Sequence, residues 1–126
     1  MAFTFTFRKS ANPHDEHPPF DLRRDGADYA DLTSPERVET AVAGGRVERV
    51  PLIPPRFGGS MSAHNLICAA PGAARALAWV EERVYEHLQN GDHVTYRADV
   101  TWKGGSAVPA ALTIDTAQEV FTLRFW

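Results

Sequence analysis

Side chains suited to acid–base, metal or phosphate chemistry gather around one segment, Val50–Asn65. It carries Arg56, His64 and Asn65 among three prolines and the pair Gly58-Gly59. Proline fixes φ and removes an amide donor, whereas glycine permits φ > 0, so we expect a rigid loop between regular elements. Shaped loops of this kind often hold binding groups. The predicted binding loop comprises Arg49, Pro51, Arg56, Phe57, Gly58, Gly59 and His64.

The order of residues in and after this loop resembles the non-specific DNA/RNA endonucleases of the ββα-metal (His-Me finger) type. In that family an acidic residue precedes Gly-His-Leu-Ile, a Phe-Gly-Gly loop follows, and an Asn-Leu-Val-Pro-like segment leads into a helix. The matching residues are Glu48, Leu52, Ile53, Phe57, Gly58, Gly59, Asn65, Leu66 and Ile67, followed in the helix by Trp79 and by Glu81 or Glu82. The match extends from Thr33 to Leu112 and implies a nuclease-like domain of the kind found in bacterial polymorphic toxins.

The chain departs from the family pattern where the chemistry would be done. Phosphodiester hydrolysis by this route needs a base that deprotonates water and a divalent ion that stabilises the developing charge. Val50-Pro51 stands where the family has Gly-His, and the family's second, metal-ligating Asn falls on Ala74 or its neighbour. Loss of a positioned base typically lowers the rate by about 10²–10⁴. We therefore expect no intact catalytic site, no metal site and no cofactor.

Two interpretations of function follow. In the first, a catalytically degenerate nuclease-like domain acts by binding another protein, as an immunity or inhibitor partner in a bacterial toxin system. In the second, the chain is an active, Mg²⁺-dependent DNA/RNA endonuclease toxin with relocated residues. Its catalytic residues would be His64, Asn65 and Arg56, its metal ligands Asn65 and Glu82, and its further phosphate contacts Arg46 and Arg49. A structural module that self-associates is a third possibility.

Other reactive groups carry less of a pattern. Two histidines with carboxylates between them, His14-Asp15-Glu16-His17, could bind a transition metal or could be solvated surface, and no third ligand is evident. The single cysteine, Cys68, excludes an internal disulfide, and its apolar neighbours predict a buried, unreactive thiol. Ser60 and Ser62 have no recognisable His/Asp partners in the sequence.

Composition sets limits on partner and location. The 126 residues suit a single domain with its own core, spanning residues 1–126. A formal net charge of −3 argues against strong nucleic-acid binding. A local groove lined by arginines is nevertheless compatible with this net charge. No signal peptide or membrane-spanning run is evident, which predicts a cytoplasmic protein without membrane association. Secretion by a signal-independent route is also compatible with these features.

Alternating apolar residues predict most of the strands. Met1–Lys9 and the stretch from His93 to Trp102 alternate with period two, and Val108–Ile114 and Val120–Trp126 follow across turns. A further strand is predicted over Arg46–Ile53. The three predicted strands from His93 onward form an antiparallel meander, and the N-terminal strand Met1–Lys9 is expected to join it.

Two helices are predicted from their caps. The first starts with Thr33 as N-cap, Pro35 in the first turn and Glu36 completing a capping box, and it ends at Gly44-Gly45. The second spans Pro71–Gln89 and stops at Asn90-Gly91; its apolar stripe is Leu77, Val80, Val84 and Leu88. Trp79 either stacks on Arg83 or joins the core. The predicted fold class is α+β: an antiparallel sheet with one long packed helix, ββα-metal-nuclease-like.

Overall fold

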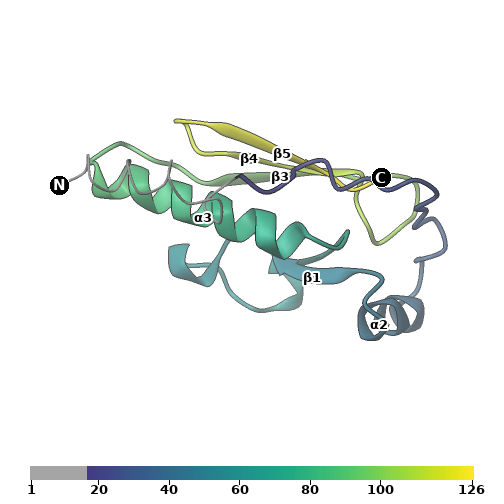
Figure 1. The fold of residues 1–126 in the computed structure, drawn as a ribbon. Coiled ribbons are helices and arrows are strands. Elements are labelled where there is room, and N and C mark those ends of the chain that lie inside the picture. Colours follow the sequence, from purple (N-terminus) through teal and green to yellow (C-terminus); the bar gives the residue numbers. More distant parts are fainter. Residues whose placement is uncertain (1–16) are drawn as a thin grey trace.

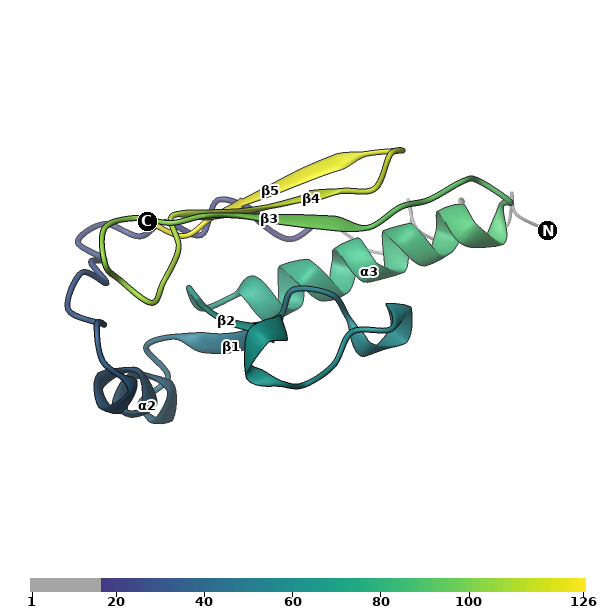
Figure 2. The same cartoon turned by 180° about the vertical axis from the view of Figure 1, so that it is seen from behind.

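Two antiparallel sheets lie on opposite sides of one long helix (Figures 1 and 2). The computed structural model describes residues 17–126. One sheet is the hairpin of β1 (Glu48–Pro51) and β2 (Leu66–Ala69), and the other is a meander in the order β3-β4-β5. The long helix α3 (Ala73–Gln89) runs between them, and α2 (Pro35–Ala43) lies at one end. The described chain is therefore α+β, as predicted.

The meander confirms the strands predicted from alternation, with shorter bounds. Its members are β3 (Arg97–Thr101), β4 (Ala111–Asp115) and β5 (Val120–Arg124). The inward residues of β4 and β5 alternate as predicted, with Leu112, Ile114, Phe121 and Leu123 all buried. The strand predicted over Met1–Lys9 lies outside the described residues.

The two edges of the meander differ. Beside β5, the Leu22 N–H donates to the Arg124 carbonyl (2.8 Å), and the Arg124 N–H donates to the Phe20 carbonyl (2.9 Å). The segment from Phe20 to Leu22 therefore covers the outer edge of β5, running parallel to it. Within residues 17–126, no strand pairs with the outer edge of β3.

The strand β2 was missed by the prediction. Leu66–Ala69 is a continuous apolar run in which the last three residues are buried. A strand covered on both faces has no period-two signal, and a short apolar run of this kind cannot be told from other buried sequence. Its pairing with β1 sets Pro51 opposite Leu66 and Glu48 opposite Ala69, so the hairpin is a second sheet and not part of the meander.

The N-cap of α2 lies one residue later than predicted. Ser34, not Thr33, is the N-cap, and its Oγ accepts a hydrogen bond from the Arg37 N–H (3.3 Å). Proline is favoured at the first helical position, so Pro35 fixes the cap on the residue before it. The third helical position is then Arg37, and Glu36 forms no capping box. The predicted end is confirmed, since Gly44 caps the helix and Gly45 has a φ of 75°.

The long helix buries apolar side chains between the two sheets. Leu77, Val80 and Val84 are buried as predicted, and small Ala73 and Ala76 join them.

The predicted apolar stripe of α3 ends one turn early, because Leu88 is 44% exposed. The last turn packs through His87 instead, whose ring nitrogens lie 2.9 Å from carboxylate oxygens of Asp92 and of Glu119. These two carboxylates raise the pKa of His87 above its ordinary value. A polar network thus closes the C-terminal end of the helix.

Trp79 is partly buried and packs against the core, and it does not stack on Arg83. Its ring lies 5.9 Å from that of Phe20 and 6.0 Å from that of Phe121, both in edge-on arrangements. Arg83 turns to Glu119 on the β4–β5 connection, with Nε to Oε2 at 2.7 Å. Hydrogen bonding from Arg83, and then from His87, keeps the pKa of Glu119 below its ordinary value.

Candidate functional site: the loop between β1 and β2

The predicted loop joins β1 to β2 and contains two short 3₁₀ turns. We call Leu52–Asn65 the 52–65 loop; its turns are Pro55–Phe57 and Ala63–Asn65. Gly58 closes the first turn in the left-handed region, with φ 94°, which a glycine adopts without strain. A loop with the turns expected from the prolines and glycines is therefore present between the two strands.

Asn65 fastens the loop across its width. Its Oδ1 accepts from the Ile53 N–H (3.1 Å), while its Nδ2 donates to the carbonyls of Ile53 (2.9 Å) and Ser60 (2.5 Å). The residue is 8% exposed. An amide that serves three backbone groups is directed into the loop, so the alternative role of Asn65 as a metal ligand or catalytic group does not fit this geometry.

Gly59 is held where no other residue fits. A Cβ at this position would lie 1.7 Å from the Ile53 carbonyl oxygen and 2.9 Å from Nδ2 of Asn65. Real Cβ atoms do not approach backbone oxygen this closely, so the second glycine of the pair is required by the crossing of two chain segments. The Phe57-Gly58-Gly59 sequence is thus explained by loop geometry.

Arg56 attaches the loop to α3. Its Nη1 lies 2.7 Å from Oε2 of Glu82 and 3.2 Å from Oε2 of Glu81, and its guanidinium carbon lies 3.9 Å from the centre of the Tyr85 ring. Hydrogen bonding to Glu82 and Glu81 raises the pKa of Arg56 further above its ordinary value. Arg56, which could have bound a phosphate, and Glu82, which could have bound a metal, therefore neutralise each other's charge.

The other side of the loop packs toward the segment before β3. The ring of Phe57 lies 5.7 Å from that of Tyr96. The Tyr96 hydroxyl is buried and has no hydrogen-bond partner within residues 17–126. Burial, with a contribution from Glu81, raises the pKa of Tyr96 to about 12. The loop is therefore held on both flanks, by Arg56 on α3 and by Phe57 on this segment.

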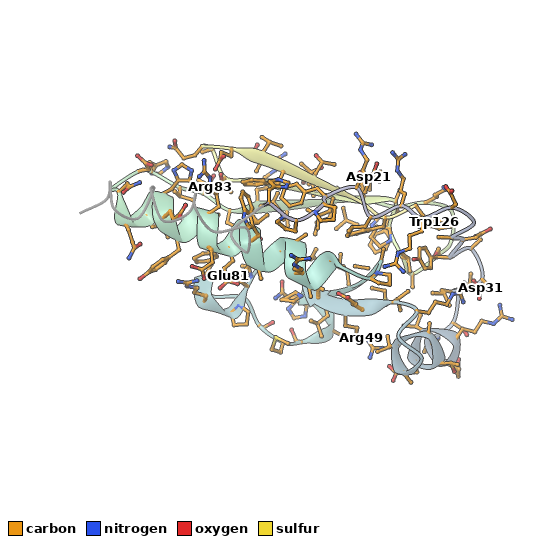
Figure 3. All side chains as sticks on the ribbon, in the orientation of Figure 1. Asp21, Asp31, Arg49, Glu81, Arg83 and Trp126 are labelled. Carbon is orange, nitrogen blue, oxygen red and sulfur yellow. The ribbon has the colours of Figure 1, made fainter. Side chains whose placement is uncertain are left out.

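The remaining arginines of the predicted site point elsewhere. Arg46 donates to both carboxylate oxygens of Asp31 (2.9 and 2.7 Å), and Arg49 forms an ion pair with Glu39 of α2. Figure 3 shows Arg49 at the α2 end of the molecule, away from Glu81. The structure thus separates Arg46 and Arg49 from Arg56.

Glu48 has a structural role that the sequence did not disclose. Its two carboxylate oxygens accept from the N–H groups of Gly72 (2.9 Å) and Ala74 (3.0 Å) at the start of α3. A carboxylate here satisfies free amides and complements the positive end of the helix dipole. Ala74, at the position expected for a ligand, offers only its backbone to this contact, and Pro51 ends β1 with no acid–base group.

The histidines do not assemble a metal site within residues 17–126. His64 is exposed beside the Ser62 hydroxyl at 3.2 Å, and Ser60 and Ser62 share a hydrogen bond of 2.6 Å. His17 packs its ring against Phe20 and Trp79, at 4.1 and 4.7 Å. No three His, Cys, Asp or Glu side chains of this part of the chain come together to hold a metal ion. His14 lies outside the described residues.

Two further observations concern single side chains. Cys68 is buried in β2, and burial raises the pKa of its thiol. Met61, at the outer part of the loop, is 64% exposed and was not singled out from the sequence. An exposed methionine on a rigid loop has no helical or strand periodicity to reveal it.

The fold and this loop define an α+β domain with an internally braced surface loop. Comparison of the chain with protein-family models, with curated proteins and with solved structures returns no match in any of the three. No helix within residues 17–126 has the length and apolar character needed to cross a bilayer.

Proposed function

We propose that the chain is a catalytically degenerate nuclease-like domain that works by binding another protein through the 52–65 loop. In this proposal it is an immunity or inhibitor partner in a bacterial toxin system. The succession of β1, loop, β2 and α3 supports the proposal, because it follows the strand–strand–helix order for which the resembled nuclease family is named. Pro51 ends the first strand, where the resemblance would require the general base.

The observation that carries the proposal is that the side chains expected to do chemistry form contacts within the protein. The Asn65 amide holds Ile53 and Ser60, and the Arg56 guanidinium is paired with the Glu82 carboxylate. Asn65, Arg56 and Glu82, which would bind a metal or a phosphate in an active nuclease, are instead used to hold the loop. What such an arrangement presents to other molecules is a fixed surface.

Met61 supplies an apolar contact on that surface. It is 64% exposed at a place where the backbone is restrained by Asn65 and Gly59. A surface that is already ordered loses little conformational entropy on association, and methionine adapts to varied partner surfaces. We therefore expect a protein partner with an apolar pocket for Met61.

A cleavage assay tests the catalytic half of the proposal. Purified protein is incubated with plasmid and RNA in Mg²⁺, Mn²⁺ or EDTA, beside a Pro51→His variant. No metal-dependent cutting by the wild type is expected, and a gain of cutting in Pro51→His would support the nuclease ancestry. EDTA-sensitive cutting by the wild type would refute the proposal and favour the active-toxin interpretation.

A binding comparison tests the other half. Proteins retained by the immobilised wild-type chain are compared with those retained by Met61→Asp and by Val120→Asp, a control that alters another exposed apolar side chain, 63% exposed, on β5. The expected result is a protein retained by the wild type and by Val120→Asp and lost with Met61→Asp. Equal retention by all three would show that the 52–65 loop is not the binding surface.

A further inference from the structure

Within the part of the chain that the structure describes, the outer edge of β3 offers unpaired backbone groups. The Thr101 carbonyl accepts from the Ala110 N–H (2.7 Å), so the odd-numbered residues of β3 point their backbone groups toward β4. Because these groups alternate along an antiparallel strand, the N–H and C=O groups of Tyr96, Ala98 and Val100 point away from β4. Within residues 17–126 nothing pairs with them. An uncovered edge is a template for another strand.

The side chains of this edge alternate in character. Arg97, Asp99 and Thr101 are exposed on the outer face, where Arg97 Nε lies 3.0 Å from Asp99 Oδ2. Ala98 and Val100 are half-buried on the inner face. A strand that joins this edge therefore meets one positive and one negative charge, two residues apart, on the same face.

A second copy of β3 matches this pattern in one antiparallel register. With the two-fold axis at Arg97 or at Asp99, like charges stand directly opposite each other, which is unfavourable. With the axis at Val100, Arg97 faces Lys103 of the second copy. With the axis at Ala98, Arg97 of each copy faces Asp99 of the other. Charge complementarity thus selects the register centred on Ala98.

The same register pairs the apolar residues of the inner face. Tyr96 of one copy stands opposite Val100 of the other, and Trp102 stands opposite Val94. Trp102 is 57% exposed in the single chain, while Val94 is partly buried against the core. Pairing about Ala98 therefore removes Trp102 from water as well as satisfying the backbone.

We propose that two copies of this chain associate through β3, antiparallel about Ala98, and join their three-stranded meanders into one continuous sheet. The contact uses an edge distinct from the 52–65 loop, so the dimer presents two such loops. It stands or fails independently of the protein-binding function proposed above.

Charge reversal tests the register. Sedimentation of the full chain over a range of concentrations should show a monomer–dimer equilibrium. Arg97→Asp alone and Asp99→Arg alone each put like charges opposite each other twice, so each should weaken self-association about tenfold or more. The double variant Arg97→Asp/Asp99→Arg restores both pairs and should dimerise like the wild type. An equimolar mixture of the two single variants should form a mixed dimer.

Cross-linking tests the position of the axis. Directly opposite residues of a hydrogen-bonded antiparallel pair have Cα atoms about 5.5 Å apart, within disulfide range. Ala98→Cys should therefore give a covalent dimer on mild oxidation, whereas Val100→Cys, whose two copies lie four residues out of register, should not. A monomer at every concentration, equal cross-linking of the two variants, or no recovery in the double variant would overturn the proposal.

Discussion

Replacing Asn65 with alanine removes the three hydrogen bonds that hold the two sides of the 52–65 loop. Each contributes about 1 kcal/mol net, and the buried backbone groups left behind lose their partners. Water reaches part of the loop and offsets some of this loss, so we expect the free energy of unfolding to fall by about 2–3 kcal/mol. For a chain of this size that corresponds to a melting temperature lower by about 6–15 °C.

The assay is urea denaturation followed by tryptophan fluorescence, with a thermal melt beside it. Asn65→Asp separates hydrogen bonding from packing, because it keeps the shape and one acceptor but sets a carboxylate oxygen against the Ile53 and Ser60 carbonyls. It should be at least as destabilising as Asn65→Ala. Asn90→Ala is the matched control, since Asn90 is exposed at the end of α3 and caps it through its backbone N–H.

A destabilisation by Asn65→Ala below about 0.5 kcal/mol, the range of an ordinary surface substitution, would refute this account of the loop. The same conclusion would follow if Asn65→Asp matched the wild type. Either result would mean that the amide is not engaged with the backbone and would return it to consideration as a ligand.

Three other outcomes can be measured. Gly59→Ala should destabilise the protein strongly through its clash with the Ile53 carbonyl, whereas Gly105→Ala, with open space around its Cβ position, should not; denaturation of the pair decides it. The folded-state pKa of His87 lies above its unfolded-state pKa. The stabilisation that protonated His87 gives to the folded protein is therefore complete below the unfolded-state pKa and is lost as the pH rises through the folded-state pKa. His87→Gln should remove that part of the decline, as unfolding at several pH values would show. The buried Cys68 thiol, with its raised pKa, should react with a thiol reagent at the rate of opening and not faster; rapid labelling of native protein would contradict its burial.

The meander and both helices were predictable because their signals are local. Alternation marked β5, and the glycines after Ala43 and Asn90 marked helix ends. The hairpin was not, because β2 is buried on both faces and its sequence has no period. Strand pairing between residues as far apart as Glu48 and Ala69 is a tertiary event that single-sequence patterns do not encode.

The presence of a loop at Leu52–Asn65 was predictable from the sequence, but the contacts that its residues make were not. Proline and glycine indicate a turn because each sets or permits particular φ angles, and this property depends only on the residue type. The contacts that decide whether Arg56 is available to a ligand come from Glu81 and Glu82, which lie on α3, far along the chain from the loop. Likewise nothing near Glu48 indicates that it caps α3.

The link from Glu48 to the first turn of α3, together with the link from Arg56 to its middle, has a consequence for folding. These links make strand, loop and helix between residues 48 and 89 depend on one another, so we expect the segment to unfold as one cooperative unit. In native-state hydrogen exchange, the amides of β1, β2 and α3 would then open together, in a single step.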